Sequence, residues 1–258
     1  MIPHQKNAWV TRWFSGLAES KLRKNFRRCS LTQTSVIPDF EPGVPILGLV
    51  NHTSWWDALM GMYMARRVFR KDFYGVFAAE ELRRYGIFRL VGCYGLDRSD
   101  PRDFKPFLKY TREILSGKSA ILWIFPQGEL MSHDDSPMKF KTGFAHIARQ
   151  FPRVHLLKIN LFYDFWVDSK PEIVIDVLPL ETVVPRKEPG FVDELTDGTA
   201  REMSERLEAV RRIVRERDSA ALKELFRREH GANFFYDFYR GLKALVRGER
   251  FRRAHTDD

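Results

Sequence analysis

The sequence contains few cysteines and no long apolar run. Its two cysteines, Cys29 and Cys93, stand in unrelated contexts with no Cys-x-x-Cys pair and no metal-ligand spacing, so we expect reduced thiols and no bound metal. No charge-free stretch reaches the roughly 18 apolar residues that span a bilayer. Residues 1–30 also lack the apolar core and the cleavage site of a signal peptide. These absences predict a protein on the cytoplasmic side, with no transmembrane span and no signal peptide.

The composition favours a folded protein with an anionic partner. The 258 residues are 44% hydrophobic and 14% aromatic, which is enough to bury the core of one large domain or one and a half. The formal net charge of +9 suits nucleic acid, an anionic lipid surface or an acidic carrier protein. The sequence has no helix-turn-helix, ribonucleoprotein aromatic pair or zinc spacing, so we expect no nucleic-acid partner.

Apolar runs recur along the chain at intervals that indicate an α/β fold. Between them lie segments with helical spacing, such as 103–117, in which apolar residues share one face and Gly117 is a natural stop. This alternation predicts a mixed, largely parallel sheet flanked by helices, and we assign the α/β core to residues 36–190. The predicted strands are 44–50, 72–77, 91–96, 120–125, 154–163 and 172–180.

Two flanking segments combine aromatic and basic residues. We expect residues 1–35 to form an amphipathic, basic, membrane-contacting segment, and residues 191–258 to form a charged helical extension packed on the core. Aromatic rings beside cations suit a membrane interface, and core packing with a basic solvent face is the alternative. The residues concerned are Trp9, Val10, Trp13, Phe14 and Leu17 in the first segment, Met203, Leu207, Val210 and Val214 on the packing face of the extension, and the aromatic and basic side chains of 234–253.

The stretch LVNHTSWWDALM, residues 49–60, places His52 directly after a predicted strand. We therefore expect His52 at the carboxyl end of a strand, where sites of α/β proteins usually form. On a regular helix, residues five apart point about 140° away from each other, so His52 and Asp57 can meet only across a turn. Thr53 or Ser54 supplies that turn as an N-cap. The alternative is that Ser54 and Asp57 are simply a capping pair.

Three further stretches lie where predicted strands end or helices begin. VGCYGLDRSD carries Arg98 just after an apolar run, AILWIFPQGEL turns at Pro126 and Gly128, and MKFKTGFAHIARQ leads from Lys139 and Lys141 into a helix. Each has an ordinary explanation as a surface cation, a strand followed by a turn, or a helix start. Their order along the chain is what makes them informative.

That order, Asn-His-x-x-x-x-Asp, Gly-x-x-x-x-x-Arg, Phe-Pro-x-Gly and Lys-x-Gly, resembles the glycerolipid acyltransferase family, which includes lysophospholipid and 1-acyl-glycerol-3-phosphate acyltransferases. The similarity covers roughly residues 45–165. It implies that His52 is the general base, that Asp57 orients it, and that no bound cofactor is needed. The acceptor-binding residues that it implies are Arg98, Gln127, Gly128, Glu129 and Lys141.

The sequence departs from the family pattern in the third of these blocks. Where the family usually reads Phe-Pro-Glu-Gly-Thr-Arg-Ser, this chain has Gln127 for the glutamate, Glu129 for the threonine and Leu130 for the arginine. Loss of a cation and gain of a carboxylate weaken phosphate binding. The acceptor therefore stays open between a lysophospholipid and a lipid without phosphate, such as a glycolipid, a carotenoid glycoside or an amino-acid lipid. A catalytically decayed lipid-binding relative is a further alternative, against which the intact His52 and Asp57 argue.

The implied reaction is O-acyl transfer without an acyl-enzyme. A neutral imidazole accepts a proton near neutral pH, and a carboxylate on its other nitrogen fixes the tautomer. His52 takes the proton of a lipid hydroxyl as the oxygen attacks an acyl thioester, with acyl-CoA or an acyl-carrier protein as co-substrate. The sequence has no Gly-x-Ser-x-Gly elbow and no catalytic-cysteine context to favour a covalent intermediate. Backbone amides near Gly128 are candidate donors to the oxyanion, and the expected setting is the surface of an anionic membrane.

Overall fold

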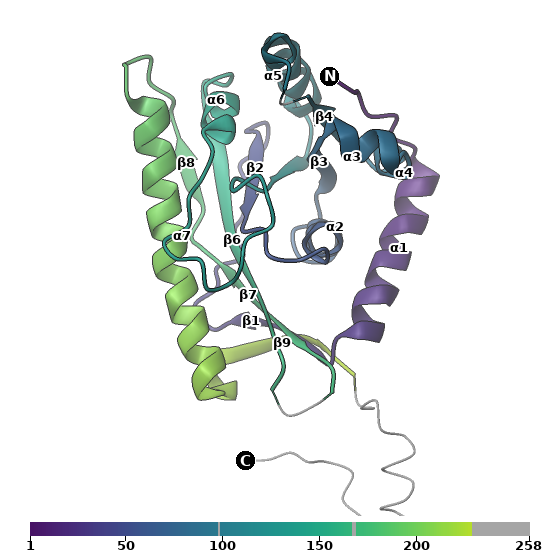
Figure 1. Cartoon of the computed structure of the whole chain (residues 1–258), viewed down its shortest axis with the longest axis vertical. Helices are drawn as coiled ribbons and strands as arrows, with labels where there is room; N and C mark the ends of the chain where they lie inside the picture. Colours follow the sequence, from purple (N-terminus) through teal and green to yellow (C-terminus); the bar gives the residue numbers. More distant parts are fainter. Residues whose placement is uncertain (98, 167–168, 229–258) are drawn as a thin grey trace, which may run out of the picture.

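A computed structural model of the chain describes residues 1–97, 99–166 and 169–228 (Figure 1). In this part of the chain, nine strands form one sheet in the order β4-β3-β5-β2-β6-β7-β1-β9, with β8 paired to β6. The strands are β1 (Arg28–Thr32), β2 (Ile46–Val50), β3 (Asp72–Ala78), β4 (Cys93–Leu96), β5 (Ala120–Ile124), β6 (Val154–Asp164), β7 (Glu172–Val177), β8 (Glu181–Val183) and β9 (Leu222–Arg227).

The centre of the sheet is parallel. Strands β4, β3, β5, β2 and β6 run parallel to one another, whereas the β6–β7, β6–β8 and β1–β9 pairs are antiparallel. Strands β2 and β5 are buried along their whole length, which is why they read as unbroken apolar runs. The predicted fold, a mixed and largely parallel sheet flanked by helices, is confirmed.

Helices cover both faces of the sheet. One buried apolar cluster includes residues of α1 and α2, and a second includes residues of α5, α6 and α7. Helices α1 and α7 stand at opposite sides of the sheet in Figure 1. The helices are α1 (Ala8–Asn25), α2 (Asp57–Arg67), α3 (Ala79–Arg84), α4 (Ile87–Leu90), α5 (Phe104–Leu115), α6 (Gly143–Ala148) and α7 (Phe191–Glu216), with single 3-10 turns at Pro101–Asp103 and Ser219–Ala221.

The C-terminal extension contains a strand as well as a helix, which corrects the prediction of an entirely helical segment. Helix α7 ends at Glu216, where Arg217 adopts a left-handed conformation with φ of 53° and closes the last turn. Residues 222–227 then form β9, antiparallel to β1. The spacing of Leu222 and Phe226 fits a helix equally well, and pairing with β1 decides between the two. Helix α7 packs on the core through Met203, Leu207, Val210 and Val214, all of which are buried.

Helix α1 divides its apolar residues between two environments. Val10 and Phe14 pack against the core, whereas Trp9 is 83% exposed and Trp13 is 61% exposed. Core packing therefore accounts for one side of α1 and leaves two tryptophan side chains in solvent.

The six predicted strands are confirmed as β2 to β7. Strands β1 and β8 are short and carry polar residues, so their sequences give no apolar run. The aromatic and basic segment 234–253 lies outside the described residues. Of the helices that the structure describes, none has the length and apolar character needed to cross a bilayer.

Candidate active site

His52 follows β2 at the carboxyl edge of the parallel sheet. The preceding residue, Asn51, is fully buried, and its side chain bridges β2 to β6. Its Nδ2 donates to the Leu161 carbonyl at 2.9 Å, and the Leu161 amide donates to Asn51 Oδ1 at 2.7 Å. This pair of hydrogen bonds extends the β2–β6 pairing by one side-chain rung. His52 is thereby placed beside the carboxyl end of β6.

His52 and Asp57 meet across the expected turn. The two side chains share a hydrogen bond of 2.8 Å between His52 Nδ1 and Asp57 Oδ2. The Asp57 side chain is completely buried, whereas the His52 side chain is 23% exposed. A buried carboxylate needs donors, so Nδ1 carries the proton and Nε2 is left as an acceptor. The pair therefore has the arrangement of a general base and its orienting carboxylate.

Asp57 also holds the turn that brings it to His52. Its Oδ2 accepts the amides of Thr53 at 2.8 Å and Ser54 at 2.9 Å, and its Oδ1 accepts the phenol of Tyr163 at 2.7 Å. Helix α2 begins at Asp57 itself, without a side-chain cap from the residue before it. The expected N-cap at Thr53 or Ser54 is therefore replaced by the carboxylate, which serves the turn and the histidine together.

The loop after β5 fixes His52 from the other side. The Phe125 ring stacks on the His52 ring, with centroids 4.1 Å apart and planes 11° from parallel. The His52 amide donates to Gln127 Oε1 at 2.5 Å, and the His52 carbonyl accepts the Met131 amide at 2.8 Å. The Phe125 ring thus holds the imidazole, and two hydrogen bonds hold the His52 backbone. Little freedom is left to its position.

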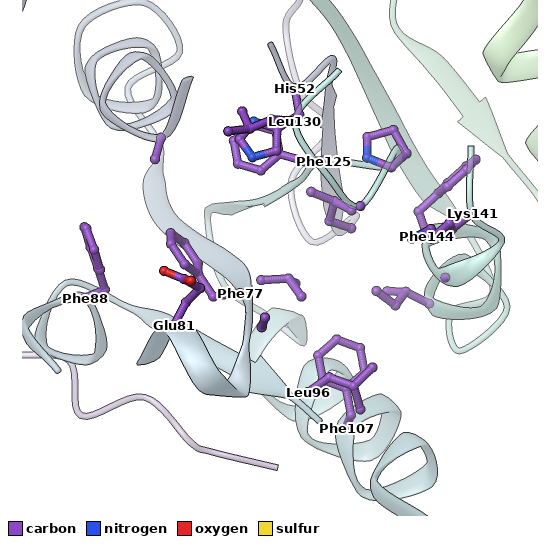
Figure 2. Close-up of a pocket in the computed structure, with 18 of the residues that line it drawn as sticks. His52, Phe77, Glu81, Phe88, Leu96, Phe107, Phe125, Leu130, Lys141 and Phe144 are labelled. Carbon is purple, nitrogen blue, oxygen red and sulfur yellow. The ribbon is translucent and has the colours of Figure 1, made fainter. Parts of the chain in front are cut away.

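A cavity of about 600 Å³ opens beside the His52 ring. Its walls are mainly apolar and aromatic, and they come from the ends of β3, β4 and β5 and from helices α2, α3, α4, α5 and α6. Figure 2 shows His52 and Phe125 together at one side, with Leu96 and Phe107 across from them. The charged side chains in the described lining, apart from His52, are those of Glu81 and Lys141. Such a cavity suits an apolar chain whose reactive end reaches the histidine.

The predicted acceptor-binding residues do not all lie at the cavity. Gly128 and Lys141 line the cavity, and Gly128 has φ of +80°, with space so limited that an added Cβ would lie 2.9 Å from Lys141 Cδ. Glu129 is exposed, and its Oε1 lies 4.0 Å from Lys141 Nζ. Gln127 is buried behind His52 and is absent from the cavity lining. Arg98 lies outside the described residues.

The backbone amide of Gly128 is engaged within its own turn. It donates to the Phe125 carbonyl at 3.0 Å. The amide of Lys141 likewise donates to the Pro126 carbonyl at 2.8 Å. Gly128 therefore contributes room for the Lys141 side chain, and its amide is committed to the turn.

Tyr163 is a site residue that the sequence did not reveal. It lies at the carboxyl end of β6, two residues beyond the rung formed by Asn51. Burial raises the pKa of the Tyr163 phenol well above its usual range, and the negative charge of Asp57 adds to the shift. The phenol therefore stays protonated and donates. The signal that could have found it is a polar group at the end of a strand adjacent to the one that carries His52.

A second histidine, His133, lies near this group. Its ring stacks on Phe162, with centroids 4.3 Å apart, and its Nε2 accepts the Tyr163 amide at 3.3 Å. Burial lowers the pKa of the His133 ring, a shift that the Asp57 charge opposes. Within the described residues, no group of three or more His, Cys, Asp or Glu side chains is arranged to hold a metal ion.

Comparison with known proteins identifies relatives at two levels. A family model described as Acyltransferase matches residues 28–161, which is more than half of the chain and includes His52 and Asp57. The fold is similar to the crystal structure of the 1-acyl-sn-glycerophosphate (LPA) acyltransferase PlsC from Thermotoga maritima, with a TM-score of 0.56 and 15% identity, covering 79% of this chain and 80% of that chain. No curated protein sequence matches the chain.

Proposed function

The chain belongs to the acyltransferase family, and on that premise we propose that it moves a fatty acyl group from an acyl thioester to a hydroxyl group of a lipid acceptor. The observation that carries this proposal is the His52–Asp57 hydrogen bond of 2.8 Å at the wall of an apolar cavity. A base without an apolar cavity would suit many reactions. A cavity without a base would suit simple lipid binding.

The proposed reaction uses His52 first as a base and then as an acid. The hydroxyl proton of the acceptor passes to His52 Nε2 as the oxygen forms a bond to the thioester carbonyl carbon. Asp57 stabilises the imidazolium that results. When the tetrahedral intermediate collapses, the carbon–sulfur bond breaks and the thiolate takes the proton back from His52. The acyl chain passes directly from thiol to hydroxyl, and the enzyme returns to its starting state.

The donor and acceptor have different chemical requirements. We expect acyl-CoA or an acyl-carrier protein as donor, with the acyl chain in the cavity next to Phe107 and Leu96. For a lysophospholipid acceptor, Lys141 is the described cation on the cavity wall that can face a phosphate. We also expect Arg98 to contribute, as the family resemblance implies.

An acceptor without phosphate is the second candidate, and the charges of the described cavity lining and of Glu129 favour it. Glu129 Oε1 lies 4.0 Å from Lys141 Nζ and offsets its charge. Glu81 adds a carboxylate to the cavity lining. Gln127, at the position where the family usually has glutamate, has its Oε1 committed to the His52 amide. One carboxylate beside Lys141 and a second elsewhere in the described lining suit hydroxyl-rich or amine-bearing headgroups better than a phosphate.

We propose that α1 docks the protein on the cytoplasmic surface of an anionic membrane. Trp9 and Trp13 are exposed, and tryptophan rings settle at the headgroup level of a bilayer. On the inner side of α1, Phe14 packs edge-to-face on Phe88 with centroids 5.9 Å apart, and Phe88 lines the cavity. The proposed docking helix and the proposed acyl site therefore share a wall.

The test is to incubate the purified protein with a labelled acyl donor and a total lipid extract and to identify the labelled product. Wild-type protein is expected to form an acylated lipid, and His52→Ala is expected to form none while keeping its folded circular-dichroism spectrum. His155→Ala is the matched control, since it removes a buried histidine near the other end of β6. Product formation by His52→Ala would exclude His52 as the base.

Acceptors with and without phosphate separate the two candidates. Lys141→Ala is expected to impair a phosphorylated acceptor strongly and to leave a neutral glycolipid acceptor little changed. If no acceptor in the extract is acylated and no thioester is consumed, the protein is a lipid-binding relative without activity.

A further inference from the structure

We infer that Tyr163 is a positioning residue that, through Asp57, sets both the orientation of His52 and the pH at which it takes up a proton. The inference rests on the proposed function of His52 as the base. Tyr163 is not among the described residues that line the cavity, and its described hydrogen bonds reach Asp57 and His133 but not His52. Its effect therefore has to pass through the carboxylate.

The hydrogen bonds at Asp57 divide between its two oxygens. Oδ2 accepts from His52 Nδ1 and from the amides of Thr53 and Ser54. Oδ1 accepts from the Tyr163 phenol at 2.7 Å. With donors on both oxygens, the carboxylate plane cannot rotate without breaking a hydrogen bond. Removal of the phenol would leave Oδ1 without its described partner in a fully buried side chain.

Tyr163 is itself held firmly enough to serve as a fixed point. Its backbone pairs with β7 opposite Ile173, and its amide donates to His133 Nε2 at 3.3 Å. The Tyr163 ring packs against Phe26 with centroids 5.7 Å apart. Two residues earlier, Leu161 is tied to Asn51, the residue before His52. The sheet therefore sets the distance between the phenol and the carboxylate.

The phenol tunes the histidine because it withdraws charge from the carboxylate. A neutral donor on Oδ1 spreads the negative charge that would otherwise stabilise an imidazolium on the other side of Asp57. In Tyr163→Phe, the full carboxylate charge faces His52 Nδ1, and the imidazolium becomes easier to form. A larger share of His52 is then protonated at a given pH, so less of it can act as a base.

The charged and titratable groups near His133, which lies beside Tyr163, and Lys141 on the cavity wall stay unchanged in this variant. They come from the loop between β5 and α6, from β6 and from α7. They are His133, Asp134 and Lys141 of the loop, Asp164 of β6 and Arg211 of α7. A change seen on replacing Tyr163 therefore reports the phenol and not a difference in its surroundings.

The first experiment is the pH profile of kcat/KM for the wild type, Tyr163→Phe and Tyr94→Phe. Tyr94 is the matched control, because its buried phenol donates to Thr111 at 2.9 Å, away from the dyad. In Tyr163→Phe the acidic limb is expected to move upward by roughly half a pH unit or more, and kcat is expected to fall about tenfold with KM changed less than about twofold. Tyr94→Phe is expected to keep the wild-type profile.

The second experiment needs no activity, so it separates failure of this inference from failure of the proposed function. NMR titration of the His52 ring, assigned by its loss in His52→Gln, is expected to show a higher midpoint in Tyr163→Phe than in the wild type. In the background of Asp57→Asn, replacing Tyr163 is expected to cause no further shift, because the carboxylate through which it acts is gone. If the protein transfers no acyl group but these shifts appear, the positioning role stands without the reaction.

A third variant covers the case in which Tyr163→Phe does not fold. Replacement of Tyr163 by 3-fluorotyrosine keeps the ring and the hydroxyl but makes the phenol a stronger donor. The midpoint of the His52 titration is expected to move downward, opposite to the shift in Tyr163→Phe. Unchanged midpoints in the fluorinated variant and in folded Tyr163→Phe, or an equal shift in Tyr94→Phe, would overturn the inference.

Discussion

The carboxylate of Asp57 lies between His52 and Tyr163 and is hydrogen-bonded to both. His52 Nδ1 is 2.8 Å from Oδ2, and the Tyr163 phenol is 2.7 Å from Oδ1. The same carboxylate accepts the amides of the turn that follows β2. A single buried side chain therefore organises the turn, the imidazole and the end of β6. This concentration of roles makes Asp57 the most sensitive position of the site.

Asp57→Asn is expected to reduce kcat by about a thousandfold or more, because an amide cannot orient the Nδ1–H tautomer as a carboxylate does and cannot stabilise an imidazolium. KM is expected to change little. Steady-state kinetics measures both. Asp176→Asn is the control, since Asp176 is a buried carboxylate bonded to Thr32 and Arg206 instead. A loss of less than about tenfold in Asp57→Asn would contradict the assigned role.

Gly128→Ala is expected to lower the free energy of unfolding by about 1 to 2 kcal/mol, because a side chain at its left-handed φ is strained. The added Cβ also displaces Lys141, so KM for an anionic acceptor is expected to rise. Urea unfolding and acceptor titration measure the two effects. Gly198→Ala in α7 is the control: nothing lies within 4 Å of an added Cβ there, and a gain of about 0.5 to 1 kcal/mol is expected.

Trp9→Ser and Trp13→Ser are each expected to weaken binding to anionic vesicles by about tenfold, because each removes a ring that settles at the headgroup level. Vesicle co-sedimentation measures the change. Val184→Ser is the control: Val184 is 62% exposed and lies directly after β8. Equal binding by all three variants would show that α1 is not the docking surface.

The free energy of unfolding is expected to fall as the pH drops below about 6.5, the ordinary value for histidine. Burial lowers the pKa of His133 in the folded protein, so the unfolded chain binds more protons in that range and gains stability from them. The stability that His133 contributes is thus fully present above the ordinary histidine pKa, and it is lost as the pH falls towards the lowered pKa of the folded protein. Burial lowers the pKa values of His4 and His155 as well, so each adds to the trend.

Urea unfolding at several pH values between about 7.5 and 5 tests this expectation. In His133→Gln, the free energy of unfolding is expected to fall less steeply with decreasing pH, because one histidine with a lowered pKa has been removed. An unchanged slope in His133→Gln would show that this ring gains a proton without cost in the folded protein.

The strands of the core could be predicted from sequence because they are buried on both faces. Runs such as 46–50 and 120–124 leave no polar residue to suggest another structure. The meeting of His52 with Asp57 was predictable for a similar reason, since five residues separate them and only a turn joins them. The strand β9 was not predictable, because its residues fit a helix until β1 is there to pair with them.

The contribution of Tyr163 could not be read from the chain, because it depends on which strands are neighbours. Asp57 and Tyr163 are far apart in sequence, and only the adjacency of β2 and β6 brings them together. Gln127 shows the opposite case. Its place in a motif suggested a role in acceptor binding, whereas in the structure its Oε1 accepts a hydrogen bond from the His52 amide.

The Asn51 side chain completes a rung between β2 and β6 that the two backbones do not make by themselves. As a consequence, the segment that carries His52 and the segment that carries Tyr163 are joined and move together. Asn51→Leu removes this rung, so it is expected to lose activity at temperatures where the protein is still folded.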